Sequence, residues 1–179
     1  MSGGTYRGPS TQNYATPARY VRALEDELGR PFALDVCAEA WNAKAERYLD
    51  VQANGLTSPW SPLNFCNPPY DNQQAWLARA AWWSETHGHT SACLVRASID
   101  TRYWFRLVVL RATCDFFFGR IPYIDPVTRK EKRGSTFASA VVLYGPQFEP
   151  GVVRWRDAES GRLIDVKRAR ELRDRELLA

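Results

Sequence analysis

The amino-acid sequence predicts an α/β fold with a mainly parallel β-sheet covered by helices. Short apolar runs typical of buried strands alternate along the chain with longer segments whose apolar residues recur at helical spacing. This alternation is typical of strand–helix–strand units, which build parallel sheets. After Gly119 the chain makes a hairpin-like excursion and returns as one more apolar run. We therefore also expect a C-terminal antiparallel hairpin strand at one end of the sheet.

Length and composition indicate one globular domain. The 179 residues are 45% hydrophobic, which is enough for a single core, and the formal net charge of +4 favours an anionic partner. The first residues lack the pattern of a secretion signal, and no apolar run reaches the length of a membrane span. The four cysteines lie far apart without a CxxC spacing, so we interpret them as buried, reduced thiols of a cytoplasmic protein.

The chain divides into three parts by composition. Residues 1–13 are rich in Gly, Ser, Thr and Gln and predict a flexible arm. Residues 14–150 contain the predicted strands and helices of the domain. Residues 151–179 form a charged extension, and the mixed basic and acidic residues of Ile164–Ala179 predict a helix there.

The first predicted helix covers Ala18–Leu28, where apolar residues recur every three or four positions. Thr16 is a suitable N-cap, with Pro17 at the first helical position, and Gly29 ends the helix.

A buried strand carrying one carboxylate is predicted next, over Phe32–Ala38. Burying an unpaired carboxylate is unfavourable, so Asp35 is either capped within the fold or part of a functional site. Ala38–Tyr48 is predicted to be a short helix and Leu49–Ser61 a loop.

The tetrapeptide Asn67-Pro68-Pro69-Tyr70 follows the apolar run Leu63–Cys66 and predicts a stiff turn at the end of a strand. Its prolines fix φ and remove two backbone donors, and the first of them holds Asn67 extended. Open α/β sheets bind their ligands at this end of their strands. The turn presents an amide, acceptor carbonyls and an aromatic face, which suit a planar ring carrying an amino group. A turn with no further role is the alternative.

The remaining elements alternate as the fold class requires. They are a helix over Gln73–Glu85, a strand over Thr90–Val95, a helix over Thr101–Ala112 capped by Asp100, and strands over Thr113–Phe118 and Phe137–Tyr144.

Basic residues gather in the excursion between the last two strands. The predicted phosphate-contacting residues are Arg120, Arg129, Lys130, Lys132 and Arg133. A solvated hairpin tip is the alternative interpretation.

Other site chemistries find little support in the sequence. It contains neither a phosphate-binding P-loop nor a GxGxxG motif. His87 and His89 flank Gly88 at the end of a predicted helix, where solvated side chains are expected, and no metal site is predicted.

An ordered set of short segments resembles one known family, the small phage-type, Dam-like DNA N6-adenine methyltransferases, which use S-adenosylmethionine. The resemblance covers about residues 14–146. Its segments are Ala15-Thr16-Pro17, Leu34–Ala38, Asn42-Ala43-Lys44, Asn54-Gly55-Leu56, Cys66–Tyr70, Asp100-Thr101-Arg102, Gly119-Arg120-Ile121 and Phe137-Ala138-Ser139.

The resemblance implies a Rossmann-like methyltransferase fold with S-adenosylmethionine over the first strand. The fold would be abbreviated, because only about 25 residues separate that strand from Leu63. The implied cofactor-binding residues are Tyr14, Thr16, Pro17, Asp35, Ala38, Asn42, Asn54, Leu56 and Asn67.

The same resemblance implies methylation of adenine in DNA. Asn67 and the carbonyl of Pro68 would accept hydrogen bonds from the target amine, Pro69 would stiffen the turn, and Tyr70 would stack on a base flipped from the duplex. The implied setting is a bacterial or phage-infected cell, where methylation protects phage or prophage DNA from restriction.

Two departures from the family pattern stand out. Asn54 occupies a position where the family usually has Asp, and Arg96 stands in a segment that usually opens with Pro-Ala. Three other functions remain open on sequence grounds: methylation of a protein glutamine amide, methylation of cytosine N4, and DNA binding without cofactor.

Overall fold

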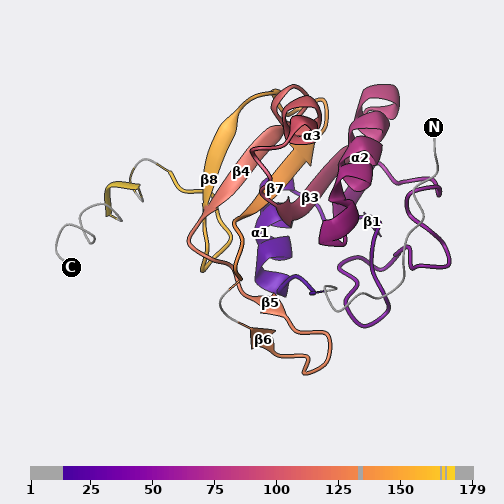
Figure 1. The fold of residues 1–179 in the computed structure, drawn as a ribbon, viewed down its shortest axis with the longest axis horizontal. Coiled ribbons are helices and arrows are strands. Elements are labelled where there is room, and N and C mark those ends of the chain that lie inside the picture. The colour runs from indigo at the N-terminus through magenta and orange to yellow at the C-terminus, as the bar shows by residue number, and fades with distance from the viewer. Residues whose placement is uncertain (1–13, 133–134, 166, 168, 172–179) are drawn as a thin grey trace.

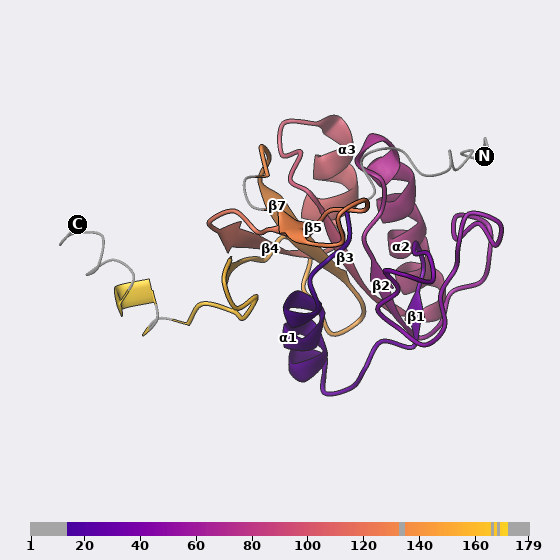
Figure 2. The same cartoon turned by 90° about the horizontal axis from the view of Figure 1, so that it is seen from below.

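The computed structural model describes residues 14–132, 135–165, 167 and 169–171. A six-stranded sheet forms its centre, with α1 on one face and α2 and α3 on the other (Figures 1 and 2). The strands of this sheet are β1 (Leu34–Asp35), β2 (Leu63–Cys66), β3 (Thr90–Arg96), β4 (Thr113–Phe118), β7 (Ser139–Tyr144) and β8 (Val153–Asp157). The helices are α1 (Ala18–Leu28), α2 (Gln73–His87) and α3 (Arg102–Trp104), which continues as the π-helix η2 (Phe105–Val109).

The strand order is β1-β2-β3-β7-β4-β8, and β7 runs antiparallel to both of its neighbours. The pairs β1–β2, β2–β3 and β4–β8 are parallel. The predicted α/β class, with a mainly parallel sheet and an antiparallel hairpin strand, is therefore confirmed. The antiparallel strand lies inside the sheet instead of at its end, because β7 inserts between β3 and β4 and pairs with both.

A separate two-stranded ribbon completes the described part of the fold. The strands β5 (Tyr123–Ile124) and β6 (Glu131–Lys132) pair antiparallel and project below the sheet in Figure 1. This excursion lies at the edge where the parallel strands of the main sheet end.

Two apolar layers fix the helices on the sheet. Trp76, Leu77 and Trp104 of α2 and α3 pack with Cys93 and Val95 of β3. On the other face, Tyr20, Val21 and Leu24 of α1 pack with Phe65, Ala92 and Leu94. Alternate residues of β3 thus serve opposite layers, as the pleat of a strand requires. None of the described helices has both the length and the apolar character needed to cross a membrane.

The segment predicted as a helix over Ala38–Tyr48 forms turns instead. Its backbone groups pair with β1: the N–H of Asp35 donates to the carbonyl of Arg47 (2.9 Å), and the N–H of Leu49 donates to the carbonyl of Asp35 (2.9 Å). Pairing along the strand edge removes partners that a helix would need.

Two predicted helix caps also differ from the structure. Pro17 stands at the N-cap position of α1, and Thr16, one residue earlier, makes no capping hydrogen bond to the helix. Thr101, not Asp100, caps α3, with its hydroxyl accepting from the N–H of Trp104 (3.3 Å).

The sheet continues beyond residue 150, where we expected the domain to end. β8 pairs with β4 over five residues and carries Arg154 and Arg156 toward the fully buried carboxylate of Asp115. Arg154 binds Asp115 through its Nε (2.7 Å), and Arg156 contacts it at 2.6 Å. Glu27 of α1 pairs with both arginines. The charged residues of this part of the extension are therefore structural. Of the helix predicted over 164–179, residues 164 and 165 are described and not helical, while residues 167 and 169–171 are described and helical.

We predict that Arg156→Leu lowers the free energy of unfolding by on the order of 3 kcal/mol, because one counter-charge of a buried carboxylate is lost. Arg162→Leu is the matched control, since the Arg162–Asp26 pair has side chains 70% and 60% exposed. Loss of this exposed ion pair should change the free energy of unfolding by less than about 1 kcal/mol. Urea denaturation of both variants measures the difference, and equal effects would contradict the prediction.

Candidate active site at the carboxyl edge of the sheet

The Asn67–Tyr70 turn leaves the carboxyl end of β2 and leads into α2 through a short 3₁₀ turn over Tyr70–Asn72. Pro68 and Pro69 are buried, and Pro69 has an extended backbone (φ −55°, ψ 134°). The prediction of a stiff turn at a strand end is confirmed.

The amide of Asn67 is oriented by one hydrogen bond. Its Nδ2 donates to the backbone carbonyl of Tyr14 at 2.7 Å. A carbonyl can only accept, so the amide nitrogen must face Tyr14 and the Oδ1 atom must face away. Tyr14 is held in turn by its neighbour Ala15, whose N–H and carbonyl bond to Ile124 of β5 (3.0 and 2.8 Å). The turn therefore presents an acceptor in a defined direction.

Two aromatic rings pack directly against Tyr70. Its ring lies edge-on to Phe137 with centroids 4.7 Å apart, and to Tyr123 with centroids 6.3 Å apart. Tyr14 packs against Tyr123 on the other side (6.4 Å). Burial, and next the neighbouring Tyr123 phenol, raise the pKa of Tyr70, so its phenol stays neutral. The turn is thus lined by an apolar, aromatic wall.

Asp35 ends β1, one strand away from the turn, and the residue is 2% exposed. The backbone N–H groups of Cys37 (3.3 Å) and Lys44 (3.0 Å) donate to it. Burial raises its pKa from 3.8 to about 6, and these hydrogen bonds oppose part of that rise. The loop therefore caps the carboxylate, as one of the two sequence interpretations proposed.

Thr16 contributes a buried hydroxyl to the same side of the molecule. Its side chain is 1% exposed, and its Oγ1 has no hydrogen-bond partner among the described residues. Pro17 and Ala38 are also buried. A buried hydroxyl without a partner is unfavourable, so a ligand atom that met it would gain affinity.

The departure at Asn54 has a backbone explanation. Asn54 adopts φ 51°, a left-handed conformation that Asn tolerates well, and its Oδ1 accepts from the N–H of Leu56 (3.2 Å). A Cβ on the following Gly55 would lie 2.0 Å from the Val36 carbonyl, so glycine is required there. The indole of Trp60 donates to the Gly55 carbonyl (2.7 Å) and holds this loop against the end of β1.

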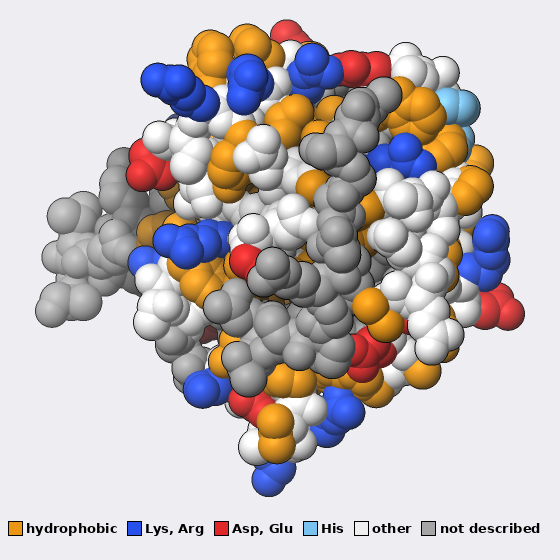
Figure 3. Space-filling view, turned by 45° about the vertical axis from the view of Figure 1, so that its right-hand side comes forward, with side chains coloured by type: hydrophobic (Ala, Val, Ile, Leu, Met, Phe, Trp, Pro, Cys, Tyr) orange, Lys and Arg blue, Asp and Glu red, His pale blue; other side chains and the backbone are white. Residues whose placement is uncertain are grey.

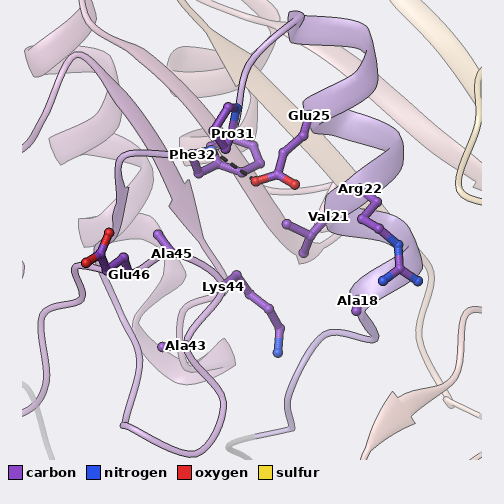
Figure 4. Close-up of a pocket in the computed structure, with 10 residues that line it drawn as sticks. All are labelled: Ala18, Val21, Arg22, Glu25, Pro31, Phe32, Ala43, Lys44, Ala45 and Glu46. Atoms are coloured by element: carbon purple, nitrogen blue, oxygen red, sulfur yellow. Dashed lines mark hydrogen bonds between the residues drawn. The ribbon is translucent and has the colours of Figure 1, made fainter.

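Asn42 serves its own loop: its Oδ1 accepts from the N–H of Glu39 at 2.7 Å. Beside it, a cleft of about 570 Å³ separates α1 from residues 43–46 (Figure 4). The Lys44 side chain extends into this space, and burial lowers its pKa. None of the residues that line the cleft belongs to the predicted cofactor or catalytic sets.

The basic residues of the excursion divide into two groups. The Arg129 guanidinium lies 3.6 Å from the centroid of the Trp41 ring, so it is engaged within the protein. Lys130, Lys132 and Arg120 are exposed, and Figure 3 shows basic side chains around the lower tip of the molecule. Arg133 lies outside the described residues.

Gln73 is a residue that sequence reasoning missed. Its Oε1 accepts from the Arg96 N–H (3.1 Å), and its Nε2, with two N–H groups, lies within hydrogen-bond distance of three acceptors, the Arg96 carbonyl (2.9 Å), Ser98 Oγ (3.1 Å) and Tyr103 Oη (2.7 Å). It thereby ties the first turn of α2 to the end of β3. Its position directly after the turn was a signal, but a polar residue at a helix start is equally typical of a solvated surface.

Comparisons with known proteins agree with the resemblance. A family profile described as DNA N-6-adenine-methyltransferase (Dam) matches residues 5–164. A protein of Haemophilus phage HP1 named DNA N-6-adenine-methyltransferase is 29% identical over 145 residues, which cover 79% of this chain and 83% of that protein.

We predict a pH-dependent difference in stability between the wild type and Asp35→Asn. The native carboxyl binds a proton more tightly than the unfolded one, so wild-type stability falls as pH rises from about 4 to about 6. The side-chain amide of the Asp35→Asn variant does not titrate in this range, so the variant lacks this pH dependence. Between pH 4 and pH 7 the free energy of unfolding of the wild type should therefore fall by about 2 kcal/mol relative to Asp35→Asn. Urea denaturation at both pH values tests this, and a constant difference would show that the hydrogen bonds fully offset burial.

Proposed function

Because the chain belongs to the DNA N-6-adenine-methyltransferase (Dam) family, a family of adenine-specific DNA methyltransferases, we propose that S-adenosylmethionine is its methyl donor and that the Asn67–Tyr70 turn holds the target adenine. The orientation of the Asn67 amide carries this proposal. With Nδ2 committed to Tyr14, Oδ1 is the end of the amide left to accept a hydrogen bond, and in this proposal it accepts from the exocyclic amine.

The residues of the turn would act by positioning. An exocyclic adenine amine delocalises its lone pair into the ring. Hydrogen bonds from its two N–H groups to Asn67 Oδ1 and to the Pro68 carbonyl favour the geometry in which that lone pair stays on nitrogen. Tyr70 stacks on the ring and keeps the amine in line. No general base with a shifted pKa is required before transfer.

S-adenosylmethionine supplies a methyl group on a sulfonium cation. The buried Thr16 hydroxyl, which has no partner among the described residues, supports the binding of such a ligand, and in this proposal Asp35 at the end of β1 lies at its other side. In this proposal Thr16, Pro17 and Tyr14 border the amino-acid end, and Ala38 allows close approach. Asn54, Leu56 and Asn42 shape the loops around the remainder.

Exposed basic residues support a DNA substrate. Lys130, Lys132 and Arg120 would contact phosphates while the target base is flipped into the site. Arg129 would join them only by leaving Trp41. The similarity to a phage protein supports a role in protecting phage or prophage DNA from restriction.

We predict that Asn67→Ala abolishes methyl transfer and leaves S-adenosylmethionine binding within about twofold, because the acceptor for the amine is lost while the other eight implied cofactor-binding residues remain. Asn72→Ala is the matched control, since Asn72 lies near the turn and its side chain does not cap α2. Transfer of labelled methyl to DNA and calorimetric titration with the cofactor measure the two effects.

Digestion of the wild-type product to nucleosides identifies the acceptor. N6-methyladenine supports the proposal. N4-methylcytosine, or label in protein glutamine, would replace it with one of the other methyltransferase functions. If the wild type did not bind S-adenosylmethionine, a role in DNA binding alone would be favoured.

We further predict that Thr16→Val weakens S-adenosylmethionine binding by about 5- to 30-fold, because an isosteric apolar group removes one buried hydrogen-bonding partner. The apo protein should be as stable as the wild type or slightly more stable, since its buried hydroxyl has no described partner. Unchanged affinity together with lower stability would show that Thr16 has a structural role only.

A further inference from the structure

Arg96, for which the sequence offered no explanation, ends β3 at the edge that carries the catalytic turn. β3 pairs with β2 on one side and with β7 on the other. The residue is exposed, whereas the six residues of β3 before it are buried. Arg96 therefore presents a cation one strand away from Asn67.

The pleat of β3 determines the face on which Arg96 lies. Ala92 and Leu94 pack in the layer beneath α1, so Arg96, two residues further on, lies on the same face. Its partner across the sheet is Ser139, whose hydroxyl is 2.9 Å from that of Tyr123. Because Tyr123 packs against Tyr70, Arg96 borders the aromatic wall around the turn.

The backbone of Arg96 is fixed relative to that turn. The Gln73 side chain accepts from the Arg96 N–H (3.1 Å) and donates to its carbonyl (2.9 Å). Gln73 is the first residue of α2, immediately after the 3₁₀ turn that begins at Tyr70. The guanidinium is thus displayed from a rigid base, so only its own side-chain torsions have to be ordered when a ligand binds.

The positive charge of Arg96 indicates an anionic ligand. Arg96 forms no ion pair with a carboxylate of the described residues, whereas Arg154 and Arg156 are neutralised by Asp115 and Glu27. A guanidinium offers a planar fork of donors that matches two phosphate oxygens. A base held at the turn carries its own sugar and phosphates out to the rim of the site, where this cation lies.

We propose that Arg96 binds a DNA phosphate next to the target nucleotide and thereby holds the flipped nucleotide in register with Asn67. The inference rests on the proposed function, since it places the base at the turn. It adds a phosphate contact on the main sheet to those expected from the excursion.

Equilibrium binding to an unmethylated DNA duplex tests the proposal directly, by fluorescence anisotropy over a range of salt concentrations. Arg96→Ala should weaken binding about tenfold and reduce the slope of log K against log [salt] by about 0.9, because one phosphate contact is lost. Arg96→Lys should keep the slope and recover part of the affinity. S-adenosylmethionine affinity should not change.

Arg30→Ala is the control for the loss of one positive charge. Arg30 is exposed beyond the end of α1, on the segment that leads to the amino end of β1. If Arg96→Ala and Arg30→Ala had the same DNA affinity and the same salt slope, the inference would be overturned.

Methyl transfer distinguishes the inference from the function on which it rests. With the wild type active on DNA, Arg96→Ala should raise the KM for DNA about tenfold and change kcat little. A wild type that binds DNA with the expected Arg96 dependence but yields no N6-methyladenine would contradict the proposed function and leave the phosphate contact standing.

Discussion

The hydrogen bond from Asn67 Nδ2 to the carbonyl of Tyr14 is the interaction on which the site depends. An asparagine amide has a donor end and an acceptor end, and it can rotate to present either. The Tyr14 carbonyl decides between them, because it can bind only the donor. The N-terminal segment is paired with β5, so the chemical character of the turn is set by residues more than fifty positions away on each side. A turn with the same sequence but without this partner would not be committed to accepting hydrogen bonds.

The elements that could be predicted from the sequence are those with strong local patterns. The 3.6-residue period identified α1 and α2, and the apolar run Thr113–Phe118 identified β4 with its bounds. The position of β7 between β3 and β4 depends on pairing partners that no local pattern encodes. The segment 38–48 has helical composition, but pairing with β1 prevails because it satisfies the backbone and caps Asp35 at the same time.

The same distinction applies to the site. The Asn67–Tyr70 turn was recognisable because two consecutive prolines constrain the backbone whatever surrounds them. Tyr123 and Phe137 were not, because an aromatic residue in an apolar run is expected in any core, and only the tertiary fold brings these two to Tyr70. Gln73 and Arg96 form a pair that is equally invisible along the chain, since 23 positions separate them. Asn54, which departed from the family pattern, fits its left-handed backbone without strain.

The ion pairs between β8 and Asp115 determine when the outer strands can pack during synthesis of the chain. Synthesis proceeds from the N-terminus, so Glu27 and Asp115 leave the ribosome well before Arg154 and Arg156. A nascent sheet that closed over Asp115 at that stage would bury a carboxylate without its counter-charges, which is strongly unfavourable. The outer strands can therefore settle only when translation has passed β8. A polypeptide that ends before β8 is therefore expected to leave this half of the sheet open and accessible to proteases.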